Sequence, residues 1–179
     1  MEHIEALQRL KVKALPVNLP KELESLDGLV IPGGESTTIS RLMVDFQLMQ
    51  PVRDLAQAGF PILGTCAGMI LLAREVSDFR LETLGLMNIK VKRNAFGRQV
   101  DSFETEIEMP ALGEQPFHAV FIRAPIIEKA DSKVEVLAKL SNGTAVAARQ
   151  GKLVAAAFHP ELTDDLRFHR YFLDVVSSN

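Results

Sequence analysis

The chain contains a single cysteine, Cys66, and the residues around it have the pattern of an activated nucleophile. Residues 64–68, Gly-Thr-Cys-Ala-Gly, lie between the apolar run 61–64 and a segment of small and apolar residues that favours a helix. Glycines two residues to either side of a nucleophile are typical of a sharp strand-to-helix turn. A helix start favours the thiolate, and the Ala67 amide can hold an oxyanion there. A structural cysteine in a tight turn is the alternative, but the flanking strand and helix favour catalysis.

A cysteine nucleophile needs a base, and His159 is the histidine whose position fits this role. It ends the apolar run 153–158, and open α/β sheets place their reactive groups just beyond the carboxyl ends of strands. Pro160 fixes the backbone between His159 and Glu161, so the carboxylate can hold the imidazole in one tautomer. We therefore predict the triad Cys66, His159 and Glu161. Without Cys66, a strand-end histidine beside an unrelated acid would be the better interpretation.

The other three histidines are expected to lie away from the chemistry. His3 belongs to a charged first helix and is predicted to be solvated. His118 precedes a strand, where an exposed position is expected. His169 lies in the last helix among charged residues and is predicted to be on the surface.

The loop 32–38, Pro-Gly-Gly-Glu-Ser-Thr-Thr, is a candidate binding loop. Two glycines let the backbone approach a ligand closely, and the Gly34 amide is the candidate second oxyanion donor. The loop lacks the lysine of a P-loop and the spacing of a dinucleotide fingerprint. A turn with a simple helix cap is the alternative, and it explains Ser36 and Thr37 adequately.

Short apolar runs alternate with helical patterns around these residues. Helices are predicted at 3–10, 21–26, 36–46, 51–58, 67–75 and 164–176, the last capped by Thr163 or Asp164, and strands at 12–17, 28–31, 61–64, 86–92, 100–109, 119–122, 134–140, 144–149 and 153–158. The dipeptide Asn142-Gly143 predicts a hairpin turn. The pattern predicts one α/β domain over 1–179, with three layers: a mainly parallel sheet, extended by mixed or antiparallel strands, and helices on both faces.

Composition and charge exclude several functions. The 20 basic and 23 acidic residues give a net charge of −3, and no cluster of Lys and Arg predicts nucleic-acid binding. No apolar run is long enough to span a membrane, and residues 1–13 are charged rather than signal-like, so a cytoplasmic protein is expected. One cysteine cannot form an internal disulfide or a multi-cysteine metal site, and we expect no metal.

Together these motifs resemble the class I, triad-type glutamine amidotransferases. The cysteine motif 64–68 and the histidine motif 158–163, Phe-His-Pro-Glu-Leu-Thr, carry the likeness to the superfamily. Segments 93–104, Arg-Asn-Ala-Phe-Gly-Arg-Gln-Val-Asp-Ser-Phe-Glu, and 121–125, Phe-Ile-Arg-Ala-Pro, are more specific. They are similar to the family of glutaminase subunits of pyridoxal 5′-phosphate synthase, and the resemblance runs from residue 2 to the C-terminus.

The resemblance implies a mechanism. Cys66 attacks the side-chain amide of L-glutamine, His159 transfers protons and Glu161 orients His159, while the Gly34 and Ala67 amides hold the oxyanion. The glutamine-binding residues implied by the family pattern are Gly34, Glu35, Ser36, Arg93, Ile122 and Arg123. Two arginines suit a substrate that carries a carboxylate, although composition alone would favour surface arginines at strand ends.

The resemblance also implies a partner, the (β/α)8-barrel subunit of pyridoxal 5′-phosphate synthase. In the family, a weak glutaminase is activated when it docks to this barrel, and ammonia passes to the barrel through a protein interior. The synthase combines ammonia with a pentose phosphate and a triose phosphate. No cofactor is implied, since pyridoxal phosphate (vitamin B6) is the product of the complex.

The N-terminus departs from the family pattern. Family members have a strand and a Leu-Gln-Gly turn before the Glu-His-Ile helix, whereas here Met1 directly precedes Glu2. We expect a sheet without that first strand, from either a misassigned start or a damaged variant. Two other functions stay open: the glutaminase of another amidotransferase, such as imidazole glycerol phosphate synthase, against which residues 93–99 argue, and a non-catalytic partner-binding subunit.

Overall fold

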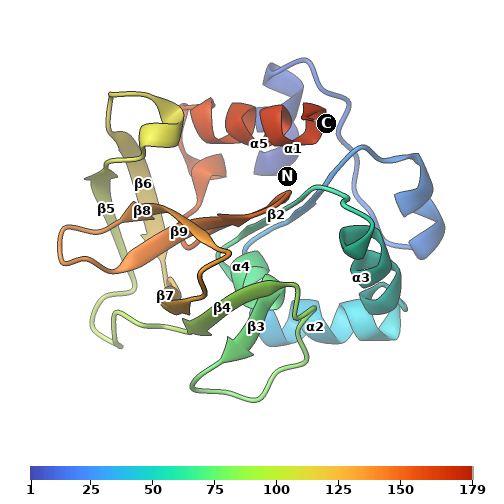
Figure 1. Cartoon of the computed structure of the whole chain (residues 1–179), viewed down its shortest axis with the longest axis horizontal. Helices are drawn as coiled ribbons and strands as arrows, with labels where there is room; N and C mark the ends of the chain where they lie inside the picture. The colour runs from blue at the N-terminus through green and yellow to red at the C-terminus, as the bar shows by residue number, and fades with distance from the viewer. Residues whose placement is uncertain (179) are drawn as a thin grey trace.

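The computed structural model describes residues 1–178 and has helices on both sides of a β-sheet (Figure 1). The strands are β1 Leu29–Ile31, β2 Ile62–Thr65, β3 Ala73–Val76, β4 Met87–Lys92, β5 Ser102–Ile107, β6 Phe117–Ile122, β7 Ile126–Ala130, β8 Glu135–Lys139, β9 Ala145–Gln150 and β10 Leu153–Ala156. The α-helices are α1 Glu2–Arg9, α2 Ser36–Asp45, α3 Met49–Gln57, α4 Ala67–Leu72 and α5 Arg167–Ser177, and the 3₁₀ helices are η1 Pro20–Ser25, η2 Pro110–Leu112 and η3 Pro160–Leu162.

β1, β2 and β10 form three adjacent parallel strands. Leu63 of β2 is paired with Val30 on one side and Val154 on the other. Both β2 and β10 are buried along their whole length, which explains why their sequences are short, continuous apolar runs. The carboxyl ends of these three strands meet at one edge of the sheet. The glycine loop, Cys66 and His159 follow them there.

The whole sheet runs in the order β1-β2-β10-β9-β7-β4-β3 with β8 paired to β9. The pairings beyond β10 are antiparallel, except that β3 lies parallel to β4. The predicted hairpin turn joins β8 to β9, where the Asn142 side chain accepts from the Thr144 amide and Gly143 has φ 87°. β5 and β6 form a separate two-stranded sheet. Its apolar side meets the core, where Phe117 and Phe121 pack against Phe158.

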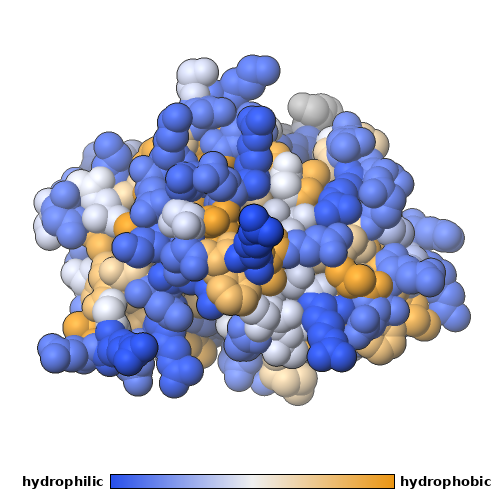
Figure 2. All heavy atoms as spheres, turned by 90° about the horizontal axis from the view of Figure 1, so that it is seen from below, coloured by the Kyte–Doolittle hydropathy of each residue, from blue (hydrophilic) through white to orange (hydrophobic). Residues whose placement is uncertain are grey.

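The helices enclose the sheet from two sides. Figure 1 shows α1 and α5 together on one side and α2 on the other, while α4 is buried along its length. Figure 2, a view from below, shows a largely hydrophilic surface with small scattered apolar patches. Within residues 1–178, no helix has the length and apolarity needed to cross a membrane.

The α/β class is confirmed, and several predicted elements are wrong. Residues 12–17 form no strand, and β1 at the edge of the sheet pairs with β2 alone in the described chain. The helix predicted at 67–75 ends at Leu72, where the chain turns extended to pair β3 with β4. β7 was not predicted. The last helix begins at Arg167 with Leu166 as N-cap, not Thr163 or Asp164.

Candidate active site

Cys66 occupies a sharp turn between β2 and α4. Its backbone angles are φ 50° and ψ −106°, a combination that is strained for any residue other than glycine. The flanking glycines are required by close packing: a Cβ atom on Gly64 would lie 2.5 Å from the Gly68 carbonyl oxygen. The Cys66 amide donates to the Ala156 carbonyl at 2.8 Å, which anchors the turn to β10. Ala67 begins α4, where the first N–H groups of a helix have no intrahelical acceptor.

His159 and Glu161 form a close pair beyond the end of β10. The His159 Nδ1 atom lies 2.7 Å from Glu161 Oε1, and both side chains are largely buried. The His159 amide donates to the Val120 carbonyl at 2.8 Å, so β6 also holds this segment. Pro160 starts η3, the single turn that brings Glu161 back to the imidazole.

Gly33 places the glycine loop against both Cys66 and His159. A Cβ atom on Gly33 would lie 2.5 Å from His159 Cε1 and 3.3 Å from Cys66 Cβ. The base and the nucleophile are therefore neighbours across this glycine. Gly33 was not among the predicted site residues, although the glycine doublet in the sequence was a signal for it.

The environment favours a protonated His159 beside an ionised Glu161. Burial opposes the charge on His159, but hydrogen bonding to Cys66 and Glu161 outweighs it and raises the pKa of His159 to about 10. Burial also opposes ionisation of Glu161, but its hydrogen bond to His159 and the nearby imidazoles lower the pKa of this carboxyl below its ordinary value. The pair can thus store and return a proton next to Cys66.

The loop that follows β1 presents its backbone rather than the Glu35 side chain. The Glu35 carboxylate caps α2, accepting from the Thr37 and Thr38 amides at 3.0 and 2.8 Å. Hydrogen bonds from the hydroxyls of Thr37 and Thr38 lower the pKa of Glu35 to about 2. Gly34 has φ 140°, a conformation that favours glycine.

Arg93 reaches this loop from the end of β4. Its Nη1 donates to Ser36 Oγ at 3.2 Å, and its guanidinium lies 4.3 Å from the centre of the Phe79 ring. The Arg93 Nε–H is buried and has no hydrogen-bond partner within residues 1–178. The structure therefore brings Arg93 and Ser36 together, with one donor still available.

Ile122 and Arg123 lie at the end of β6, on another side of Cys66. The Ile122 carbonyl accepts from Cys66 Sγ at 3.8 Å. The Arg123 side chain is 73% exposed and lies 3.6 Å from the Asp101 carboxylate. Arg123 also has φ 44°, a strained conformation next to the site. Ile122 is thus in contact with the thiol, whereas the Arg123 side chain is directed to Asp101.

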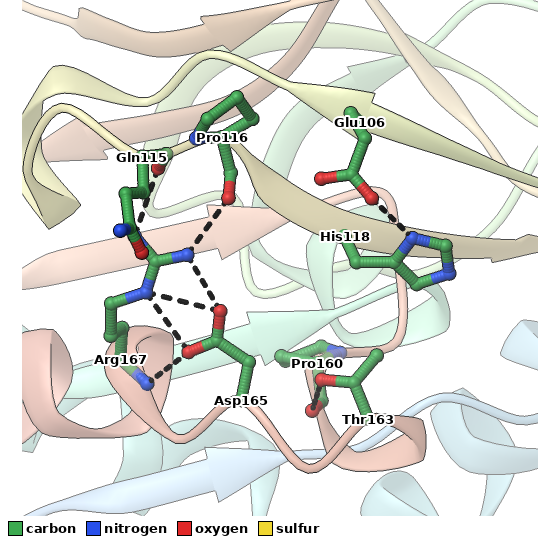
Figure 3. Close-up of polar contacts among 8 residues, drawn as sticks. All are labelled: Glu106, Gln115, Pro116, His118, Pro160, Thr163, Asp165 and Arg167. Carbon is green, nitrogen blue, oxygen red and sulfur yellow. Dashed lines mark hydrogen bonds and ion pairs between the residues drawn. The ribbon is translucent and has the colours of Figure 1, made fainter.

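Arg167 holds the segment that follows Glu161 (Figure 3). Its guanidinium donates to both oxygens of Asp165 and to the carbonyls of Gln115 and Pro116. These bonds tie the start of α5 to the segment before β6. His118, also drawn in Figure 3, lies within β6 and not before it, and is half-exposed where an exposed position was expected. It contacts the carboxylates of Glu104 and Glu106.

The predictions for His3 and His169 are wrong. His3 is 8% exposed and His169 is fully buried. His3 Nε2 lies 3.0 Å from Thr65 Oγ1 and 3.3 Å from Glu161 Oε2, and His3 Nδ1 lies 3.0 Å from His169 Nε2. They are buried because α1 and α5 pack against each other through the helix faces that carry His3 and His169. His169 follows Phe168 and lies three residues from Phe172, a core position that the charged neighbours obscured.

Comparisons with known proteins match this chain over nearly its whole length to glutamine amidotransferases. The model of the SNO glutamine amidotransferase family matches residues 1–178. The chain is 60% identical over 176 residues to the pyridoxal 5′-phosphate synthase subunit PdxT of Herpetosiphon aurantiacus, covering 97% of this chain and 93% of the relative. The corresponding protein of Moorella thermoacetica is 57% identical, with 98% and 93% covered.

Solved structures give the same result for the fold. A crystal structure described as a glutamine amidotransferase superposes with a TM-score of 0.93 at 46% identity, covering 99% of this chain and 93% of that one. The structure of PurLQS from Thermotoga maritima reaches a TM-score of 0.69 at 14% identity, covering 98% of this chain and 92% of that one, which shows a shared fold alone.

Proposed function

This chain belongs to the SNO glutamine amidotransferase family, and we propose that it is the glutaminase subunit of pyridoxal 5′-phosphate synthase, which hydrolyses L-glutamine to L-glutamate and ammonia. The observation that carries this proposal is the strained turn at Cys66 beside the His159–Glu161 pair with its 2.7 Å contact. The identity of 60% to a relative named as the synthase subunit supports the same activity.

In the first half-reaction, the Cys66 sulfur forms a bond to the side-chain amide carbon of glutamine. The amide oxygen becomes an oxyanion, which the Gly34 and Ala67 amides stabilise. His159 gives its proton to the amide nitrogen, the C–N bond breaks and ammonia leaves. A glutamyl thioester on Cys66 remains.

In the second half-reaction, the now neutral His159 takes a proton from water. The hydroxide attacks the thioester carbon, the C–S bond breaks and glutamate leaves, which restores the thiolate beside a protonated His159. Glu161 keeps Nδ1 of His159 protonated, so that Nε2 carries out both transfers. The balance is glutamine plus water giving glutamate plus ammonia.

Substrate selection follows from the groups around the thiol. The buried, unpartnered Nε–H of Arg93 and its fixed guanidinium suit the glutamine carboxylate. Ser36, Ile122 and Arg123 complete the binding site. Gly34 and Glu35 contribute backbone groups, because the Glu35 carboxylate is already used in capping α2.

The ammonia passes to a (β/α)8-barrel synthase subunit, and no cofactor acts in this chain. A free thiol nucleophile suits a reducing compartment, so the cytoplasm is the proposed location.

Ammonia release from glutamine and asparagine, measured with and without a synthase subunit, tests this function. We expect release from glutamine, stimulated by the synthase, and none from asparagine. No release from glutamine under either condition would overturn the proposal.

A further inference from the structure

Two buried histidines from opposite ends of the chain lie directly behind Glu161. His3 comes from α1 and His169 from α5, and their rings are 5.2 Å apart between centroids. His3 Nδ1 lies 3.0 Å from His169 Nε2, and the other side of the His3 ring faces Thr65 and Glu161. The catalytic mechanism uses neither histidine, although burying two imidazoles is costly unless their polar atoms are paired.

The contacts determine which nitrogen carries a proton in each ring. If His169 Nε2–H donates to His3 Nδ1, then His3 carries its proton on Nε2 and donates it to Thr65 Oγ1. Glu161 Oε2, which accepts no hydrogen bond among the described residues, lies 3.3 Å from the same nitrogen and faces its positive end. In the opposite arrangement, a neutral His3 would point a lone pair at the Glu161 carboxylate. The buried His169 Nδ1, which has no partner among the described residues, would then be an unpaired N–H. The first arrangement removes the repulsion at Glu161 and leaves His169 Nδ1 as an unpaired acceptor in place of an unpaired donor.

His3 thereby connects the two halves of the catalytic site. Its Nε2 atom is hydrogen-bonded to Thr65, the residue before Cys66, and lies 3.3 Å from Glu161 Oε2, the carboxylate oxygen that His159 does not use. We propose that neutral His3, itself oriented by His169, is a positioning residue that fixes Glu161 against His159 and aligns the strand end that carries Cys66. This inference rests on the proposed glutaminase mechanism.

The charges around the two rings agree with neutral imidazoles. Burial lowers the pKa of His3, and the charge of Glu161 offsets this only in part. Burial also lowers the pKa of His169 to about 4. The charged or titratable groups that act on the two rings are Glu161, His159, Glu2 and the N-terminus of the chain. Glu5, Arg9 and Asp164 line a hollow of about 230 Å³ on the outer side of Glu161.

Two substitutions of His3 test the role of its Nε2–H donor separately from the role of its Nδ1 atom. In His3→Gln, the amide nitrogen can replace Nε2–H and reach Thr65 and Glu161. In His3→Asn, the shorter amide can replace Nδ1 and keep the contact with His169, but it cannot reach Glu161. His118→Gln is the control, because His118 is a half-exposed histidine on β6 that contacts Glu104 and Glu106.

The two readouts are NMR titration of the His159 imidazole and steady-state glutaminase kinetics in the presence of the synthase subunit. We expect His3→Asn to lower kcat about tenfold to a hundredfold with little change in KM, because the catalytic groups are misplaced while the glutamine contacts remain. Its His159 titration should move to lower pH. His3→Gln should retain most of kcat and the wild-type titration. Equal effects of His3→Gln and His3→Asn, or an effect on KM alone, would overturn the proposal.

A measurement on the unmodified chain covers the case in which a variant does not fold. Nitrogen-15 NMR at neutral pH should show His3 protonated on Nε2 only and His169 on Nε2 only. A charged His3, or a proton on His3 Nδ1, would contradict the proposal. Both NMR measurements are independent of turnover, so a chain that releases no ammonia would refute the proposed function without deciding the role of His3.

Discussion

Gly68 packs so closely against Ile31 that a Cβ atom at position 68 would lie 1.9 Å from the Ile31 carbonyl oxygen. This contact presses the first turn of α4 onto the end of β1 and holds the Cys66 turn between two strands. Gly68→Ala should therefore destabilise the chain by at least about 1–3 kcal/mol, as overpacking against a rigid backbone does. Urea unfolding measures the change, with Gln57→Ala, at an exposed position of α3, as the control. A stability equal to that of the wild type would show that the turn is not packed as described.

The raised pKa of His159 links stability to alkaline pH. Because the folded-state pKa is about 10 against an ordinary 6.5, the protonated imidazole contributes its full stabilisation below pH 6.5. That contribution is lost as the pH rises through 10. The free energy of unfolding should thus fall between these limits in the wild type, and fall less in His159→Gln. Parallel curves for the two proteins would contradict the assigned ion pair.

The lowered pKa of His169 predicts a loss of stability at acidic pH. Its pKa of about 4 in the folded state lies below the ordinary 6.5, so the unfolded chain binds more protons between these values. Stability should therefore fall as the pH falls from 6.5 towards 4, and His3, whose pKa is also lowered, adds to the effect. His169→Gln keeps a donor for His3 but cannot titrate, so its acid sensitivity should be weaker. Thermal unfolding at several pH values measures this, and an unchanged pH dependence would count against a buried neutral His169.

Arg93 and Arg123 should differ in their effects on glutamine binding. Arg93→Ala removes a buried guanidinium held by Ser36, and we expect KM to rise about tenfold to a hundredfold, the value of a charge-assisted hydrogen bond. Arg123→Ala removes a side chain that is 73% exposed and paired with Asp101, so its KM should rise less. Initial rates over a range of glutamine concentrations give both values. A larger effect at Arg123 would reverse the assignment of the carboxylate contact.

The sequence predicted the parts of the site that depend on local spacing. The glycines around Cys66 and the proline between His159 and Glu161 act within a few residues, so their patterns are visible in the chain. His3 and His169 lie 166 positions apart in sequence and meet only because α1 and α5 pack side by side. No local pattern identifies such a contact. The absence of a strand at 12–17 likewise depends on pairing, which apolar composition alone does not decide.

We propose that Cys66 is the nucleophile that takes ammonia from glutamine. The most direct test is ammonia release by Cys66→Ala in the presence of the synthase, once circular dichroism has shown a wild-type fold. We expect a loss of at least about a thousandfold in kcat, since Cys66 is the single cysteine of the chain and alone can form the thioester. Turnover at the wild-type rate in the folded Cys66→Ala protein would contradict it.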